Sequence, residues 1–403
     1  MRIVHVIGSS LDKGAAKGAL WLHQEMRATG IESYLLHTGS NGLRILEDGI
    51  IPAHGQSLHY LRKVLLRFRA LGIRGLYKNY KKELFSLGKG PISITQIEQR
   101  LKPDIIHLHW INNWSINYSS IKKANVPVFW TLRDMWPFTG GCHYSVNCEK
   151  YVDECGACPL LASKHNLDLS RLVFNYKVRN NPTNVHYIGI SNWIIKEFQR
   201  TKFASSKVSY IPNGLRTGDW FPVPTLDEIN EFAQGRKIIL IGAVNLNAAY
   251  KGGKHISTLT SHLASEDYCV VAFGKIDENF VKSFKLSTLL LGVIKDEAKL
   301  RAVYSSCHVY FFPSILEAFG KTVVESILCG TPVVCFGNTG PGEIVEHKRT
   351  GYICETSNVR DIVSGIEFSS TLPISIECRR EVAHRFSVKN TAKEMINLYT
   401  NAS

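Results

Sequence analysis

Residues 313–325 read Pro313-Ser314-Ile315-Leu316-Glu317-Ala318-Phe319-Gly320-Lys321-Thr322-Val323-Val324-Glu325. The residues just before them, 307–312, are apolar and rich in strand-forming types, so they predict a buried strand. After Gly320 the pattern turns helical and stops at Gly330, a common helix-ending residue, and residues 331–336 predict another strand. A strand–loop–helix–strand unit predicts an α/β fold with a parallel sheet.

The loop between this strand and this helix is a candidate binding site. Glu317 lies at the carboxyl end of the strand, where open α/β sheets bind ligands, and Glu325 follows eight residues later. Gly320 allows a ligand to approach the backbone closely, and the N–H groups of a first helical turn suit phosphate oxygens. The alternative is a surface loop followed by an ordinary amphipathic helix.

Several motifs of the chain resemble retaining glycosyltransferase family 4, and they occur in the family's order. Glu317 and Glu325 match the family's E-x7-E signature. Further matches are Pro212-Asn213-Gly214, Lys251-Gly252, residues 329–334 and residues 340–345. The run at 134–144, Asp-Met-Trp-Pro-Phe-Thr-Gly-Gly-Cys-His-Tyr, is similar to that of members that build bacterial polysaccharides. The likeness is strongest over residues 185–355 and looser over most of the rest.

The resemblance implies a GT-B fold, in which two Rossmann-like domains face each other across a cleft. It also implies transfer of a hexosyl group, with retention, from a nucleotide-diphosphate sugar to a hydroxyl of a glycan or lipid-linked oligosaccharide. The diphosphate oxygen would take the acceptor proton, and no divalent metal would be required. The expected domains are 1–214, with 386–403 packing back on it, and 236–385, joined by a linker at 215–235 that contains prolines and little periodic pattern.

The resemblance also implies roles for individual residues. Glu317 would contact the donor sugar, Glu325 the nucleotide ribose and Lys251 the diphosphate, although a lysine at a helix start is also an ordinary surface residue. The full donor-binding set is Gly14, Lys251, Glu317, Ala318, Phe319, Gly320, Lys321 and Glu325. Gly14 belongs to a glycine-containing loop between strand and helix, which a tight turn without ligand explains almost equally well.

The sequence departs from the family's pattern at two positions. Arg133-Asp134 stands where many members have His-Asp, and Ala243 stands where members commonly have an arginine. We therefore expect the catalytic residues Glu317, Lys251, Arg133 and Asp134. The alternative for Arg133 and Asp134 is a salt bridge with each other.

Residues 104–114 predict another strand with a polar and aromatic tail. Sugars stack on aromatic faces, and amides bind their rims, so Trp110, Asn112 and Asn113 are the expected acceptor-binding residues. His109 is more simply a core histidine with its hydrogen bonds satisfied.

The 403 residues carry a net charge of +14, which points to an anionic partner. Residues 60–82 contain eight basic residues and no acidic one, interleaved with Leu, Phe and Tyr. Such a segment suits an anionic membrane surface, at about 1 kcal/mol per basic residue; the alternative is a solvated helix face. The chain shows no signal-peptide pattern and no apolar run long enough to span a bilayer, so we expect a cytoplasmic protein on the inner face of the membrane.

Four of the ten cysteines are clustered in the sequence: Cys142, Cys148, Cys155 and Cys158. The last pair has the C-x2-C spacing of a zinc knuckle, whereas the first pair is spaced more loosely. We expect either a structural zinc site or unligated buried thiols. Four thiolates leave no open position on zinc, so a catalytic zinc is not expected.

Three other functions remain open. A GT-B epimerase would use the same donor without an acceptor, and a glycan phosphorylase would release sugar phosphate. A basic nucleic-acid-binding protein with a zinc knuckle belongs to a different class, but the sequence lacks a recognition helix, so no nucleic-acid partner is expected.

Overall fold

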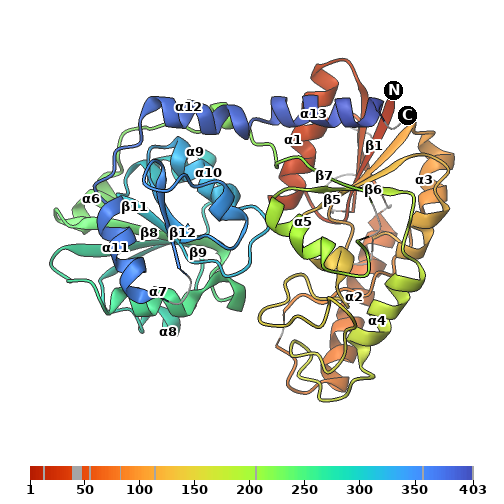
Figure 1. Ribbon diagram of the computed structural model, residues 1–403, viewed down its shortest axis with the longest axis horizontal. Coiled ribbons are helices and arrows are strands. Elements are labelled where there is room, and N and C mark those ends of the chain that lie inside the picture. The colour runs from red at the N-terminus through yellow and green to blue at the C-terminus, as the bar shows by residue number, and fades with distance from the viewer. Residues whose placement is uncertain are drawn as a thin grey trace. The chain divides into compact units, whose positions relative to one another are not determined.

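The computed structural model describes residues 1–11, 14–38, 48–53, 56–81, 83–112, 115–204, 207–355 and 358–401, without the side chains of 56–63 and 69–70. The chain forms two compact units (Figure 1). The first comprises Met1–Gly214 with Val388–Ser403, and the second comprises Leu215–Ser387. The chain therefore passes from one unit to the other at 214–215 and returns at 387–388.

The first unit is built on a parallel sheet of seven strands in the order β3-β2-β1-β4-β5-β6-β7. The strands are β1 (Arg2–Ile7), β2 (Glu32–His37), β3 (Ile50–Pro52), β4 (Ile105–Leu108), β5 (Val128–Leu132), β6 (Val185–Gly189) and β7 (Val208–Tyr210). Its helices are α1 (Gly14–Ala28), α2 (Gln56–Leu76), α3 (Ile94–Leu101), α4 (Leu169–Arg179), α5 (Asn192–Gln199) and α13 (Val388–Thr400), with short 3-10 turns η1 (Tyr118–Lys123) and η2 (Trp136–Phe138).

The core of the first unit explains why the C-terminal helix belongs to it. Leu22 and Met26 of α1 pack with Met395 and Tyr399 of α13 over apolar residues of the sheet, such as Ile105. Figure 1 shows α13, at the blue end of the colour scale, beside α1 at the red end. The two ends of the sequence thus complete one hydrophobic core.

The second unit has a parallel sheet of six strands in the order β10-β9-β8-β11-β12-β13. The strands are β8 (Lys237–Asn245), β9 (Tyr268–Lys275), β10 (Thr288–Gly292), β11 (Val309–Phe312), β12 (Val333–Phe336) and β13 (Gly351–Cys354). The helices are α6 (Asp227–Ala233), α7 (Gly253–Thr260), α8 (Glu278–Val281), α9 (Glu297–Ser305), α10 (Lys321–Leu328), α11 (Val359–Ser369) and α12 (Ile376–Arg385), with turns η3 (Thr217–Asp219), η4 (Ala249–Lys251) and η5 (Gly340–Glu343).

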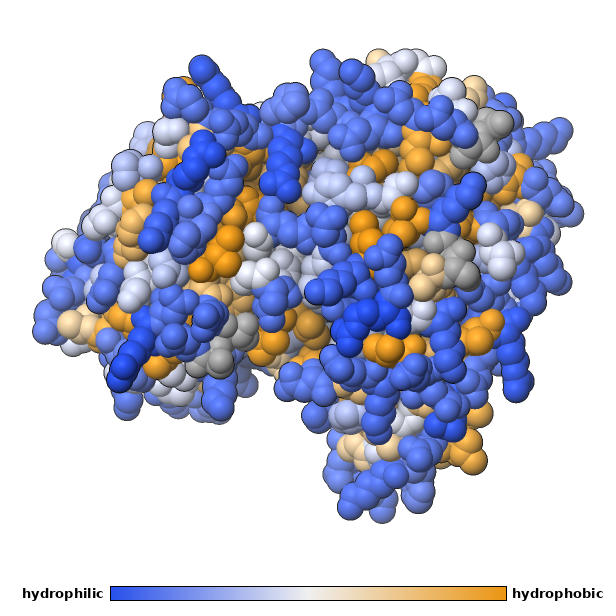
Figure 2. All heavy atoms as spheres, viewed as in Figure 1, coloured by the Kyte–Doolittle hydropathy of each residue, from blue (hydrophilic) through white to orange (hydrophobic). Residues whose placement is uncertain are grey.

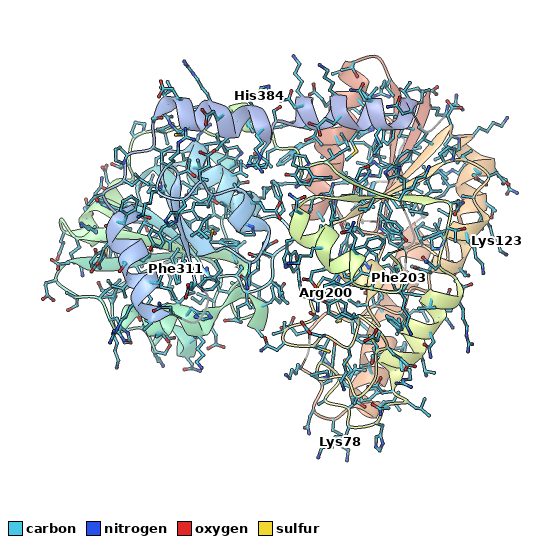
Figure 3. The ribbon with its side chains drawn as sticks, viewed as in Figure 1. Lys78, Lys123, Arg200, Phe203, Phe311 and His384 are labelled. Carbon is cyan, nitrogen blue, oxygen red and sulfur yellow. The ribbon has the colours of Figure 1, made fainter. Side chains whose placement is uncertain are left out.

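Both sheets have the doubly wound topology of a dinucleotide-binding fold. Numbered within its own unit, the second sheet runs 3-2-1-4-5-6, and the first sheet runs the same way with one more strand. α7 and α11 bury their apolar faces on one side of the second sheet, where Phe311 is fully buried (Figure 3). The prediction of two Rossmann-like α/β domains is confirmed.

Residues 215–235, expected as a linker, are packed into the second unit instead. Trp220 is 5% exposed and its ring lies 5.9 Å from that of Tyr304. Residues 227–233 form α6, in which Ile229 is fully buried. The sequence pattern did not predict this structure, because prolines interrupt the periodicity that indicates a helix or a strand. In the described residues, no helix combines the length and apolarity needed to cross a bilayer.

Candidate active site

The second unit gathers charged side chains at its topological switch point. The order of the strands reverses between β8 and β11, and a doubly wound sheet binds ligands outside the carboxyl ends of such strands. The segment after β8 carries Lys251, and the segment after β11 carries Glu317. Gly252 brings the two segments together, because an added Cβ there would lie 1.8 Å from the carbonyl oxygen of Pro313.

Lys251 and Glu317 form an ion pair, with Nζ 2.5 Å from Oε2. Both side chains are mostly enclosed, at 15% and 17% exposure. The ammonium also lies 5.4 Å from the ring centroid of Tyr250 and 5.6 Å from that of Phe312. Gly340 donates its N–H to the carbonyl of Glu317, which fixes the loop from the other side. The pair therefore presents one cation and one carboxylate from a rigid frame.

The second carboxylate of the motif, Glu325, lies on α10 and is fully buried. Lys321 Nζ lies 2.7 Å from its Oε1, and Tyr304 donates its hydroxyl to Oε2 at 3.1 Å. Burial raises the pKa of Glu325, and Lys321 partly offsets this. Burial raises the pKa of Tyr310, and Glu325 and Glu317 add to this shift.

The residues between the two carboxylates shape the loop. Gly320 adopts φ +94°, which favours glycine, and caps α10 without a side-chain hydrogen bond. Ala318 and Phe319 are buried, and the Phe319 ring lies 5.5 Å from that of Phe386. These two residues were expected to bind the donor, and their side chains are buried within the second unit.

The first unit holds Arg133 at the end of β5. Its guanidinium donates from Nη1 to Asn213 Oδ1 at 2.9 Å, and Nη2 lies 3.2 Å from His109 Nδ1. Gly18 leaves room for it, because an added Cβ there would lie 3.0 Å from Nη1. Burial lowers the pKa of Arg133 to about 10. Arg133, Asn213 and Gly18 line a small hollow, together with Thr391 of α13.

Asp134 pairs with a histidine rather than with Arg133. Its Oδ2 lies 2.6 Å from His143 Nδ1 and accepts the indole N–H of Trp110 at 2.8 Å, while Oδ1 accepts the backbone N–H of Trp136. The salt bridge considered between Arg133 and Asp134 is therefore wrong. His143 Nε2 lies 3.0 Å from Ser86 Oγ, which completes a buried Ser–His–Asp line. Since Ser86 is 1% exposed, this line orients Trp110 rather than attacking a substrate.

Two of the expected acceptor residues belong to this network. Asn112 Nδ2 lies 3.3 Å from His143 Nδ1, and Trp110 lies beside the same imidazole, with 5.5 Å between ring centroids. Asn113 lies outside the described residues. Gly14 begins α1 and has open space around it, so no contact there requires glycine. Sequence reasoning missed His143 as a site residue; its position nine residues after Asp134 was the available signal.

Three buried histidines extend from Arg133 into the sheet. His109 Nδ1 faces the donor Arg133, so His109 carries its proton on Nε2 and donates to His5 Nδ1 at 3.1 Å. His107 is held by Thr131 and Tyr399. Burial lowers the pKa of His5, His107 and His109 well below the usual value. Their nitrogens approach within 4.8 Å, but the hydrogen bonds and the adjacent guanidinium disfavour a metal there.

The four clustered cysteines line a separate, partly open cavity in the first unit, and all four are free thiols. The Lys251–Glu317 pair lies in the second unit, and Arg133 lies in the first.

Comparison with known proteins follows the same division. Residues 13–218 match the family model of Glycosyltransferase Family 4, and residues 226–387 match that of glycosyl transferases group 1. Among curated proteins, WcaC of Escherichia coli (strain K12), a glycosyl transferase named for colanic acid biosynthesis, is 22% identical over 96% of this chain and 96% of its own. The O-antigen chain mannosyltransferase B of Escherichia coli is 29% identical over 27% of this chain and 29% of its own.

Solved structures show the same architecture. Sucrose-phosphate synthase from Thermosynechococcus elongatus aligns with a TM-score of 0.68 at 16% identity, over 100% of this chain and 99% of its own. HepE of Anabaena, solved with UDP and glucose, aligns with a TM-score of 0.62 at 14% identity, over 99% of both chains. The chain therefore belongs to glycosyltransferase family 4 and has the GT-B fold.

Proposed function

We propose that the chain transfers a hexosyl group from a nucleotide-diphosphate sugar to a hydroxyl of a glycan or lipid-linked oligosaccharide, with retention, in polysaccharide biosynthesis. The observation that carries the proposal is the Lys251–Glu317 pair at the switch point of the second sheet. WcaC and the O-antigen mannosyltransferase support the substrate class by their names. HepE, solved with UDP-glucose, supports the donor class.

The chemistry follows from where charge develops. The departing diphosphate gains negative charge, and Lys251 offers a cation beside two helices, α7 and α10, whose N-termini have no side-chain cap. Glu317 keeps that cation in place and can also accept hydrogen bonds from hydroxyls of the donor sugar. No nucleophile is proposed: the acceptor attacks on the face that the diphosphate leaves, and a diphosphate oxygen takes its proton.

Arg133 and Trp110 are proposed to serve the acceptor side of the reaction. Arg133 is held by the neutral acceptors Asn213 and His109, which orient its charge without cancelling it. Trp110 is fixed by Asp134 and offers an aromatic surface.

The test is a thermal-shift panel of UDP-, GDP- and ADP-sugars, followed by product analysis with the donor that binds. The proposal expects nucleotide release that depends on acceptor, and a product with the donor's anomeric configuration. A product with the inverted anomeric configuration would refute the proposal. An epimerised donor would indicate an epimerase instead, and a free sugar phosphate would indicate a phosphorylase. A shifted nucleic acid band on a gel would favour the other class.

We also propose that α2 binds an anionic membrane surface on the cytoplasmic side. Phe68, Leu71 and Leu76 are 67%, 59% and 76% exposed, and they alternate with the basic residues Arg67 and Arg74. Lys78 follows at the tip of the first unit (Figure 3). Figure 2 shows hydrophobic and hydrophilic residues interleaved on this part of the surface. Arg62, Lys63, Arg69 and Lys82 of the predicted basic segment lie outside the described side chains.

The exposed side chains of α2 define the liposome test. The wild-type chain is expected to sediment with vesicles that contain anionic lipid, and less so as salt rises. Phe68→Ser with Leu71→Ser is expected to weaken sedimentation, whereas Ile376→Ser, which changes an exposed apolar residue of α12, leaves it intact. The membrane proposal would be refuted if the wild-type chain did not sediment with the vesicles. It would also be refuted if sedimentation changed neither with salt nor with the substitutions in α2.

A further inference from the structure

The cysteine cavity lies outside the site proposed for sugar transfer. Cys142, Cys148, Cys155 and Cys158 all line it, with Phe85 and Gly140 among its other walls. Cys155 and Cys158 are buried and the other two are half-buried. Four unpaired thiols around one partly open hollow, all from a segment of 17 residues, match the ligand count of a closed structural zinc site.

Backbone groups are directed at two of these sulfurs. Burial raises the pKa of Cys155 and Cys158, and the backbone N–H groups of Gly140 for Cys155 and of Leu160 and Leu161 for Cys158 oppose that rise. A side chain at Gly140 would prevent this approach, because its Cβ would lie 2.8 Å from Cys155 Sγ. A thiolate needs such donors far more than a neutral thiol does, since N–H groups stabilise the charged form.

The loop that carries the cysteines has an unusual backbone. In the part of the chain that is described, seven non-glycine residues have positive φ, and four of them lie in this loop: Val146, Asn147, Ala157 and Ala162. A positive φ is rare for a branched residue such as Val146. The loop contains no helix or strand between η2 and α4. Such strain persists only where other bonds hold the loop in place.

A buried cation stands beside the cavity. Lys177 of α4 is fully buried, donates to the carbonyl of Thr139 at 3.0 Å, and has its ammonium 3.7 Å from the ring centroid of Trp136. Burial lowers the pKa of Lys177 to about 7, and Cys142, Cys155 and Asp134 oppose that shift when they are charged. A buried ammonium is costly unless negative charge lies nearby, and bound thiolates would supply that charge.

We propose that Cys142, Cys148, Cys155 and Cys158 bind one zinc ion as a structural tetrathiolate site. Binding releases the four thiol protons to solvent, and the site of net charge −2 is partly balanced by Lys177. Zinc requires Zn–S distances of about 2.3 Å, whereas no three of the four sulfurs lie within 4.8 Å of one another in the structure. The cysteine side chains must therefore turn inward from the cavity wall when the ion binds.

The site would fix the part of the loop that reaches the acceptor-side network. Cys142 precedes His143, which is bonded to Asp134, which in turn holds Trp110. A closed zinc site takes no part in sugar transfer, so its loss acts on folding and on the position of Trp110. This inference does not depend on the identity of the donor.

Metal content of the full chain, purified without chelator, is the direct test. One zinc per chain is expected for the wild type and for Cys378→Ala, which changes a buried cysteine on α12. Cys155→Ala and Cys158→Ala are expected to lose the zinc. Equal zinc in all four proteins, stoichiometric iron in place of zinc, or a disulfide within the cluster would overturn the proposal.

A second measurement covers variants that do not fold. Titration of the wild-type chain with a mercurial reagent is expected to release one zinc as the first four thiols react, out of ten. Removal of the zinc by a strong chelator is expected to lower the Tm, and added zinc to restore it. Wild-type protein that contains no zinc and takes up none when zinc is added would refute the site.

Discussion

Replacement of Lys251 by alanine is the sharpest test of the proposed donor site. The ammonium lies 2.5 Å from Glu317, and the Lys251 side chain is 15% exposed. A diphosphate bound to this ammonium would therefore interact with it in a partly desolvated environment. A hydrogen bond to a charged group contributes about 1.5 to 3 kcal/mol. Loss of that interaction corresponds to roughly 10- to 150-fold weaker binding of the diphosphate.

Calorimetric titration can separate this effect from others. With the nucleotide that the donor panel selects, Lys251→Ala should weaken binding of the nucleoside diphosphate by that factor, but leave the much weaker binding of the nucleoside unchanged. Lys254→Ala is the matched control, because Lys254 is an exposed lysine on α7. Transfer should fall in the same proportion, since the charge on the diphosphate grows as the bond to the sugar breaks.

The reciprocal variant tests whether the pair acts as a unit. Glu317→Gln removes the charge that holds Lys251 but keeps the side chain's size. If the two side chains work together, the combined variant should lose less transfer than the sum of the two single losses. Diphosphate binding by Lys251→Ala within twofold of the Lys254→Ala value would show that the reasoning is wrong.

Two further predictions concern stability. Glu325→Ala should lower the free energy of unfolding of the second unit by about 3 kcal/mol in chemical denaturation, because it leaves Lys321 without its carboxylate partner beside a buried site. Glu325→Gln can still accept a hydrogen bond from Tyr304, so it should lower the free energy of unfolding by less. Equal losses for the two variants would contradict the role of charge. Burial lowers the pKa of His5, His107 and His109 in the folded state, so these groups bind up to three more protons in the unfolded chain as the pH falls below about 6.5, and the lowered pKa of His23, His37 and His186 adds to this difference. Stability of the first unit should therefore drop by at least about 4 kcal/mol per pH unit below that value, and a flat profile between pH 6 and 5 would refute neutral histidines.

Local pattern predicted the second unit well because its motif is contiguous. The strand, loop and helix around Glu317 are encoded within residues 307–330, and β11 and α10 were placed within two residues of their ends in the structure. The pairing of Lys251 with Glu317 joins positions 66 residues apart, and only the family resemblance brought them into one expected site. Periodicity could not have done so, since it carries no information on which strands are neighbours.

The first unit shows what local pattern lacks. The alternative considered for Arg133 was a salt bridge with its chain neighbour Asp134, but successive residues leave a strand in opposite directions, so Arg133 reaches Asn213 while Asp134 reaches His143. The histidine cluster depends on register: His5 of β1 lies opposite His107 of β4. That register depends on which strands are neighbours in the folded sheet. The order of the strands cannot be predicted from local sequence pattern alone.

The charges of the two units differ in a way that bears on Ala243, where the family commonly has an arginine. The second unit's cations at the switch point, Lys251 and Lys321, are each paired with a carboxylate, so a diphosphate must compete for them. The partners recorded for Arg133 in the described residues are uncharged, an amide oxygen and an imidazole nitrogen. A guanidinium oriented in this way keeps its full charge for a ligand. Ala243 leaves the second unit to hold the diphosphate with these paired lysines, whereas Arg133 of the first unit is expected to keep its charge for the acceptor side.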